Sequence, residues 1–296
     1  MIDTLGVNTF KICTKEDIKK LESLNFIMKD KNRYKDTKNY LAIRPNKNRT
    51  STMIECLEKI DNIKVKTNHN GFISRLDIAF DNKSKIEENY KLYLLLLGCI
   101  SYTRTRSLEK FFITEIMDFK KNRIEKGNLK LKTSKKELTI YNCEDKEGRL
   151  ANTRIENRIL LIENKFTNEE KIIKEIDKYN FELQNIIDNI DKFLLVVEDY
   201  FINFIVSLWE EEQQTCLNIQ EFIKTIEQKK IIITKRILKE FLYKINYKKN
   251  VENFIRRYRQ TRGNKSLEFI CKKDLILLCK DIIRDNKQTI RVKIIN

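Results

Sequence analysis

One strand-like segment, residues 71–81 (GFISRLDIAFD), constrains the fold more than any other part of this chain. Side chains of a β-strand alternate between its two faces. The apolar residues of the segment would share one face: Leu76, Ile78 and Phe80. The charged residues would share the other, with only Ala79 between them: Arg75, Asp77 and Asp81. Such a row is either a solvated, salt-bridged face or the floor of a site for a metal ion and a phosphate.

A similar charged row occurs later, at residues 154–158 (RIENR), in a strand predicted over roughly 152–164. The residues before it, 128–133 and 136–143, predict a β-hairpin. In the second strand of this hairpin, Tyr141 falls on the face opposite the apolar residues.

The first half of the chain mixes strand and helix patterns, which favours an α+β fold with helices covering one face of an antiparallel sheet. Strands are predicted over 2–13, 39–44 and 71–82, and helices over 14–24, 50–61 and 84–98. After residue 168, apolar residues recur at helical spacing. They predict one long amphipathic helix or two in series, then helices over 219–228, 234–245, 248–259 and 271–284. We therefore divide the chain into an α+β domain (1–167), a long helix or linker (168–216) and a basic, all-helical region (217–296).

The chain is strongly basic, with 60 Lys and Arg against 43 Asp and Glu and a net charge of +17. This charge favours a polyanionic partner, either nucleic acid or an anionic membrane surface. No apolar run is long and uninterrupted enough to span a bilayer, and no secretory signal is visible at the N-terminus. The seven scattered cysteines form no C-x-x-C pair. These features predict a cytoplasmic protein with reduced thiols.

The acidic residues Asp77, Asp81 and Glu156 have two interpretations. Carboxylates on neighbouring strands suit a hard divalent cation such as Mg²⁺ or Mn²⁺. Alternatively, they face solvent and pair with the arginines of the same rows, Arg75, Arg154 and Arg158.

Tyr141 and His69 limit the kinds of catalytic site that this chain could form. A tyrosine is a covalent nucleophile for a phosphodiester when a cationic group stabilises the phenolate, although it is also an ordinary packing residue. His69 is the single histidine of the chain, so any site that needs two histidines is excluded.

Two basic segments suit DNA contacts, although either is also compatible with solvent exposure alone. The first is residues 101–107, with Arg104 and Arg106. The second, residues 256–265, is the strongest basic cluster: Arg256, Arg257, Arg259, Arg262 and Lys265.

Taken in order, these motifs resemble the gene II replication proteins of filamentous phages and, more widely, phage and plasmid replication initiation factors. The resemblance covers about residues 1–165. It rests on five segments: residues 1–5 (MIDTL), 74–77 (SRLD), 104–107 (RTRS), 138–141 (LTIY) and 154–158 (RIENR). Many relatives carry a lysine two residues after the tyrosine, where this chain has Cys143.

The resemblance implies a replication-initiator nuclease-like domain that nicks one strand of a phage or plasmid origin and starts rolling-circle replication. Tyr141 matches the nucleophile, which keeps the 5′ phosphate and leaves a 3′-OH primer. Asp77 and Glu156, with Asp81 as an optional addition, match the ligands of Mg²⁺ or Mn²⁺. Arg75 and Arg154 would orient the phosphate. The implied partners are double-stranded and single-stranded origin DNA and the host replication helicase and polymerase, in a bacterial cytoplasm.

Two alternatives stay open at this level. One is a non-catalytic DNA-binding protein, such as a replication or copy-number regulator. The other is a conjugative relaxase or transposase that uses the same tyrosine chemistry.

Overall fold

The computed structural model describes residues 2–9, 14–16, 19, 26–29, 39–43, 71–109, 129–133, 135–143, 153–160, 169–212, 218–228, 234–262 and 272–291. Within these ranges the chain forms two compact units, each assembled from separate segments. Unit 1 comprises residues 1–85, 128–184 and 280–296, and unit 2 comprises residues 86–127 and 185–279.

Unit 1 contains a seven-stranded sheet in the order β2-β3-β1-β4-β7-β6-β5, in which all neighbouring strands are antiparallel. The first four strands are β1 (Ile2–Thr9), β2 (Phe26–Lys29), β3 (Asn39–Ile43) and β4 (Gly71–Asn82). The others are β5 (Leu129–Lys132), β6 (Lys136–Asn142) and β7 (Thr153–Leu160). The predicted strand at 71–82 and the predicted hairpin are thus confirmed.

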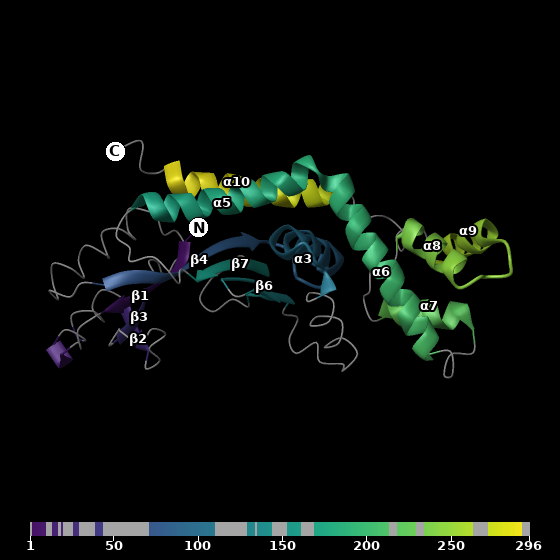
Figure 1. Ribbon diagram of the computed structural model, residues 1–296, viewed down its shortest axis with the longest axis horizontal. Coiled ribbons are helices and arrows are strands. Elements are labelled where there is room, and N and C mark those ends of the chain that lie inside the picture. The colour runs from purple at the N-terminus through teal and green to yellow at the C-terminus, as the bar shows by residue number, and fades with distance from the viewer. Residues whose placement is uncertain are drawn as a thin grey trace. The chain divides into compact units, whose positions relative to one another are not determined.

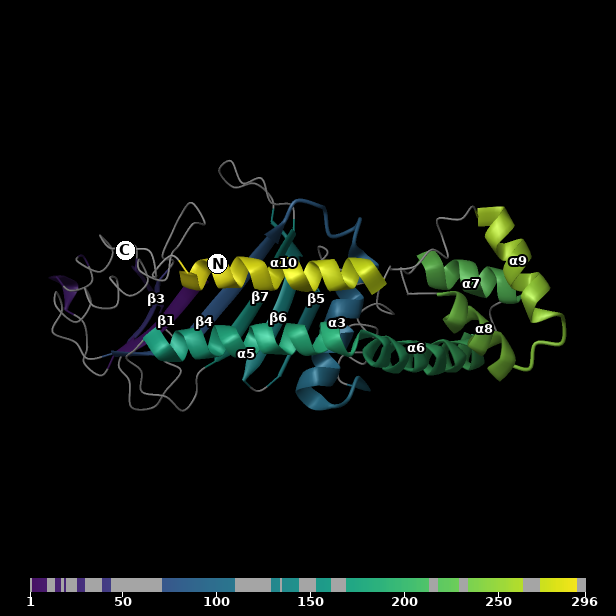
Figure 2. The same cartoon turned by 90° about the horizontal axis from the view of Figure 1, so that it is seen from above.

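One face of the sheet is apolar, as the alternation in the sequence predicts. Its buried apolar residues on β4, β6 and β7 are Leu76, Ile78, Leu138, Ile140, Ile155 and Ile159. Figures 1 and 2 show two helices lying side by side over the sheet, α5 (Glu169–Asp188) and α10 (Lys272–Arg291). The chain therefore has a mixed α+β fold with an antiparallel sheet covered by helices, which confirms that part of the predicted fold class.

The two covering helices have buried apolar residues and are joined by one buried hydrogen bond between amide side chains. In α5, the buried residues Ile172, Ile176, Tyr179 and Leu183 recur at spacings of three and four. The Nδ2 group of Asn286 in α10 donates to Oδ1 of Asn180 in α5 at 2.9 Å, and both side chains are buried. A buried polar pair of this kind penalises other registers of the two helices, because sliding would leave both amides unsatisfied.

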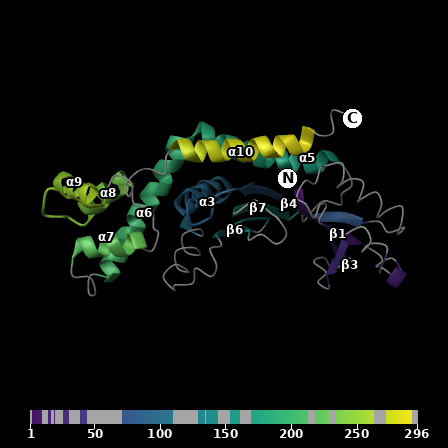
Figure 3. The ribbon, with the colours of Figure 1, turned by 180° about the vertical axis from the view of Figure 1, so that it is seen from behind.

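Unit 2 is helical in its described part. It contains α3 (Tyr90–Thr105), α6 (Ile190–Glu212), α7 (Ile219–Gln228), α8 (Lys235–Lys244) and α9 (Val251–Arg262). In Figure 3, α7, α8 and α9 gather at one end of α6. Their core is aromatic: Trp209 of α6 lies edge-on to Phe222 of α7 and Phe241 of α8, with centroid distances of 5.0 and 6.3 Å.

Several predicted boundaries shift for local reasons. The helix predicted over 84–98 begins at Tyr90 and continues to Thr105, where the Thr103 and Thr105 hydroxyls bond carbonyls four residues back. Arg106 then ends it in the left-handed conformation, with its N–H bonded to Tyr102. Arg104 thus lies in the last turn of α3.

The later helices follow the predicted order, although α9 (predicted over 248–259) runs from Val251 to Arg262 and α10 (predicted over 271–284) continues to Arg291. The long segment after 168 divides into α5 and α6. The predicted helix at 50–61 lies outside the described residues. The compact units combine segments that are distant in sequence, whereas we divided the chain into consecutive segments; that functional division stays a prediction. No helix in the described ranges is both long and apolar enough to cross a bilayer.

Candidate metal and tyrosine site

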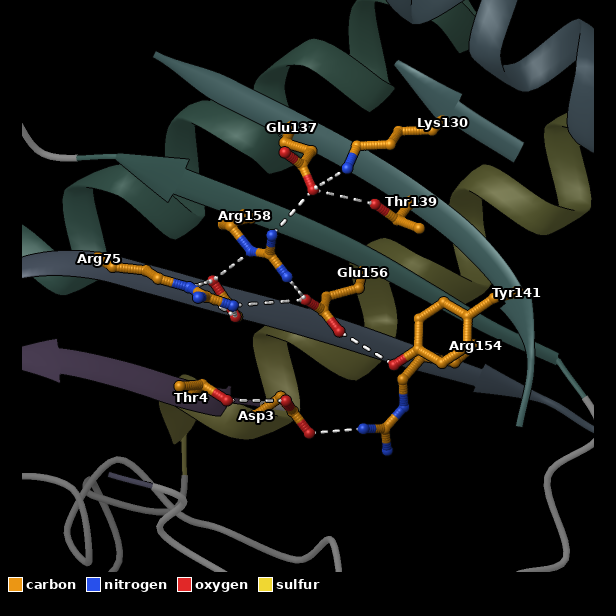
Figure 4. A network of polar contacts seen from close by, with 11 residues as sticks. Asp3, Thr4, Arg75, Lys130, Glu137, Thr139, Tyr141, Arg154, Glu156 and Arg158 are labelled. Carbon is orange, nitrogen blue, oxygen red and sulfur yellow. Dashed lines mark hydrogen bonds and ion pairs between the residues drawn. The ribbon is translucent and has the colours of Figure 1, made fainter. Parts of the chain in front are cut away.

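A polar network covers the sheet face opposite the apolar one, on strands β1, β4, β7 and β6 (Figure 4). Figure 4 shows its side chains on the near side of the sheet, with helices behind. The strand register creates the network. Ala79 of β4 and Thr139 of β6 flank Glu156, and Asp81 and Tyr141 flank Arg154. The two charged rows of the sequence are therefore adjacent in the structure.

The centre of the network is an acidic triad of Asp3, Asp77 and Glu156, defined by carboxylate oxygens that all lie within 4.8 Å of one another. Asp3 joins it because of a β-bulge. Ile2 pairs with Ile78 and Thr4 pairs with Asp77, so Asp3 is the extra residue between them. A bulge of this kind redirects a side chain that strict alternation would place on the other face.

Asp77 is fully buried and is held mainly by Arg75. The Nε group of Arg75 donates to Oδ1 of Asp77 at 2.8 Å, and Nη2 bonds Oδ2. Burial raises the pKa of Asp77 to about 6, and the nearby charge of Glu156 also raises it, while Arg75 opposes both effects. The site thus holds a carboxylate whose charge is costly unless cations surround it.

Arg158 links the triad to a fourth carboxylate. Its Nη2 group donates to Oε1 of Glu156 at 2.9 Å, and its Nη1 group donates to Glu137 at 2.8 Å. Glu137 also pairs with Lys130 at 3.0 Å. Burial alone would raise the pKa of Glu137, but the bond from Lys130 and the charge of Arg158 bring it below its ordinary value. Glu137 is therefore an ionised anchor for Arg158.

Arg154 clamps two aspartates at the other end of the network. It donates to both carboxylate oxygens of Asp81, at 2.7 and 2.9 Å, and its Nη1 group donates to Asp3. Burial would lower the pKa of Arg154, but the bond to Asp81 and the charge of Asp3 raise it instead. Asp3 also accepts a bond from the hydroxyl of Thr4, so its carboxylate is fixed from two sides.

Tyr141 points its hydroxyl at the triad. The hydroxyl donates to Oε2 of Glu156 at 3.0 Å (Figure 4). Burial raises the pKa of Tyr141, the charge of Glu156 raises it further, and Arg154 acts in the opposite direction. In the absence of an added positive charge, the hydroxyl is therefore a weak acid and a poor nucleophile.

The structure brings together six residues singled out from the sequence: Arg75, Asp77, Asp81, Tyr141, Arg154 and Glu156. Asp81 lies against Arg154 rather than within the group of three close carboxylates. Arg75 and Arg154, assigned to the phosphate by resemblance, both bond carboxylates.

The predicted DNA contacts belong to unit 2. Arg104 and Arg106 lie at the end of α3, and four arginines lie in α9: Arg256, Arg257, Arg259 and Arg262. Arg256 and Arg257 have exposed side chains. Lys265 and His69 fall outside the described residues.

The sequence analysis missed Asp3 and Glu137 as members of the network. The signal for Asp3 was the spacing of Ile2 and Leu5. Both are apolar and pair with residues of the apolar face of β4, Ile2 with Ile78 and Leu5 with Leu76. Residues three apart cannot share a face of a regular strand, so a bulge is required. Glu137 carried a weaker signal, because it shares a strand face with Thr139 and Tyr141.

The donor set of the triad fits a hard divalent cation. Mg²⁺ and Mn²⁺ prefer oxygen ligands, and Asp3, Asp77 and Glu156 offer only carboxylate oxygens. The burial of Asp77 and Glu156 also favours a cation, because buried carboxylates are stabilised by positive charge at close range. The triad could therefore hold a metal ion.

Comparison with protein-family models, with curated proteins and with solved structures finds no match to this chain.

Proposed function

We propose that this chain is a metal-dependent DNA-nicking enzyme that initiates rolling-circle replication of a phage or plasmid from one cut strand of its origin. The observation that carries the proposal is the 3.0 Å bond from the Tyr141 hydroxyl to Glu156, itself a member of the acidic triad. Under this proposal, the nucleophile Tyr141, the base Glu156 and the oxygen ligands of the metal lie on the same face of the sheet. The resemblance to replication initiators adds the substrate class.

In the proposed step, the oxygen of Tyr141 attacks the scissile phosphorus and forms a phosphotyrosine bond to the 5′ side. The bond from phosphorus to the 3′ oxygen breaks, and that oxygen takes a proton from water. The hydroxyl proton of Tyr141 passes to Glu156, which already accepts its hydrogen bond. The free 3′-OH then serves as the primer.

Asp3, Asp77 and Glu156 would hold Mg²⁺ or Mn²⁺, which when bound lowers the cost of the phenolate and of charge on the phosphate. Arg75 and Arg158 hold Asp77 and Glu156 in position. Arg154 holds Asp3 and Asp81, and its charge already opposes the rise in the pKa of Tyr141. Arginine is suited to holding a carboxylate in position because its planar guanidinium group bonds both oxygens at once.

The test is covalent trapping. Wild type is incubated with Mn²⁺ and single strands of the DNA that flanks its own gene, and the adducted peptide is identified by mass spectrometry. We expect a nucleotide on Tyr141 and no adduct from Tyr141→Phe, while the exposed-site control Tyr243→Phe still forms it. An adduct on another tyrosine would show that Tyr141 is not the nucleophile.

A second candidate function is a non-catalytic DNA-binding regulator with the same sheet. The observation that favours it is the raised pKa of Tyr141, together with the donors that already bond each carboxylate of the triad. Under this alternative, wild type binds the flanking DNA. It does not nick that DNA in supercoiled form, and it forms no covalent DNA adduct in the presence of any divalent metal.

A further inference from the structure

Helix α9 presents two opposite faces. One face packs into unit 2 through four buried residues: Val251, Phe254, Ile255 and Tyr258. The rest of its surface exposes Glu252, which pairs with Lys239, and four residues that carry long polar side chains or an amide: Asn253, Arg256, Arg257 and Gln260. Asn253, Arg256 and Gln260 are spaced by three and four residues, so they form one stripe along the helix.

The helix that carries this stripe is firmly held. Oδ1 of Asn250 caps its first turn by accepting a bond from the N–H of Asn253 at 2.9 Å. On the buried face, the rings of Phe254 and Tyr258 stack with centroids 6.2 Å apart, and Tyr247 packs edge-on against Phe254. The stripe therefore lies on a helix whose position is fixed by its cap and its buried face.

The stripe differs in charge balance from the neighbouring helix. On α8, Arg236 bonds Glu198 and Asp199 of α6, and Lys239 bonds Glu252 of α9. Arg256 forms no ion pair with another residue in the described part of the chain. Exposed Lys248 and Lys249 lie just before the helix and add charge at its N-terminal end.

The residue types of the stripe match the edges of DNA bases. In the major groove, arginine donates two bonds to guanine, and asparagine or glutamine pairs with adenine. A helix of 12 residues is about 18 Å long and fits this groove, which is about 12 Å wide. We propose that α9 reads duplex DNA from the major groove, with base contacts from Asn253, Arg256 and Gln260 and phosphate contacts from Lys248 and Lys249.

Other polyanionic partners fit this surface less well. A membrane-binding helix turns an apolar face outward, whereas the apolar face of α9 is buried in unit 2. The major groove of double-stranded RNA is too deep and narrow for side chains to read. The inference deepens the proposed function by supplying sequence-specific recognition of the duplex origin, and it rests on that function only for the identity of the DNA.

The experiment selects bound duplexes from a pool with a randomised core, using the full chain with Tyr141→Phe so that nicking does not deplete the pool. Asn253→Ala, Arg256→Ala, Arg256→Lys and Gln260→Ala are compared in this background. Lys224→Ala is the matched control, because Lys224 is exposed on α7 of the same unit. Circular dichroism checks that each variant is folded.

We expect the parent to enrich a defined motif. Asn253→Ala, Arg256→Ala and Gln260→Ala should each relax one base position by about 5- to 100-fold. Arg256→Lys should keep most of the total affinity but lose base preference, because lysine lacks the planar fork. Lys224→Ala should keep the motif unchanged.

The inference fails if the parent enriches no motif, if the folded α9 variants enrich the parental one, or if double-stranded RNA competes as well as the selected duplex. A selected motif without any nicking of DNA that contains it would instead remove the proposed catalysis and leave the α9 inference standing.

Discussion

The two units use charge in opposite ways. On the sheet face of unit 1, Asp77, Glu156 and Arg154 are buried. Each forms an ion pair with another residue of that face: Asp77 with Arg75, Glu156 with Arg158 and Arg154 with Asp81. On helices α8 and α9 of unit 2, charged groups lie at the surface. In the ion pair of Arg236 with Asp199 of α6, for example, the two side chains are 36% and 60% exposed. The comparison teaches that burial, rather than the number of charges, separates residues committed to a fixed site from residues available to a partner.

The largest expected effect comes from breaking the buried network. Arg154→Met leaves the carboxylates of Asp3 and Asp81 without their shared cation, so we expect a loss of about 3–5 kcal/mol in the free energy of unfolding. Urea denaturation followed by circular dichroism measures it. A loss below about 1 kcal/mol would mean that these charges behave like surface pairs and that the comparison is wrong.

The stability gained on metal binding tests whether the triad is the metal site. At Mn²⁺ concentrations near 100 times the dissociation constant, wild type should gain about 2.7 kcal/mol of stability. Asp3→Ala should remove most of this gain because it deletes a member of the triad, whereas Asp81→Ala should keep it. Thermal unfolding with and without Mn²⁺ provides the measurement. Equal responses of the two variants would argue against the triad as the metal site.

A smaller effect is expected at the start of α8. The hydroxyl of Thr234 accepts a bond from the N–H of Ile237 at 3.1 Å and donates to Glu198 of α6 at 2.9 Å. Thr234→Ala should therefore destabilise unit 2 by about 1 kcal/mol, as for other helix caps. The fluorescence of Trp209, which packs against α7 and α8, follows this unit in denaturant. Thr234→Ser should restore most of the loss, and its failure to do so would assign the effect to the lost methyl group.

The smallest loss of stability is expected from breaking the exposed ion pairs of Arg236 in unit 2. Arg236→Met removes the pairs with Glu198 and Asp199 at a site where the arginine is about one-third exposed. We expect at most about 1 kcal/mol, and less in high salt, because exposed pairs are screened. The same fluorescence measurement at low and high salt tests this. A salt-independent loss as large as that of Arg154→Met would contradict the contrast between the units.

Parts of the fold could be predicted because local patterns fix them. The alternation in residues 71–82 predicts a strand with one charged face, and the structure confirms it. Residues 219–228 were predicted as a helix and form α7 with the same bounds. The end of α3 was missed because its continuation depends on the Thr103 and Thr105 hydroxyls and on the left-handed Arg106.

The candidate site was predictable only in part. Asp77, Tyr141 and Glu156 were found from strand alternation and from the order of the motifs. Asp3 could not be assigned to their face by alternation, because the bulge in β1 changes the face of a single residue. The metal-ligand role that we gave Asp81 stays a prediction, although the structure places its carboxylate on Arg154.

By itself, the sequence determined which side of β4, β6 and β7 is polar and where most of the late helices lie. It also determined that the chain carries a large positive charge. The strand and helix patterns could be read because they depend on residues near in sequence. Only the tertiary structure decided which charges meet. The register between β4, β7 and β6 sets Glu156 beside Tyr141, and the bulge in β1 adds Asp3. These contacts join residues up to about 150 positions apart, so they are fixed by strand pairing and burial rather than by local pattern.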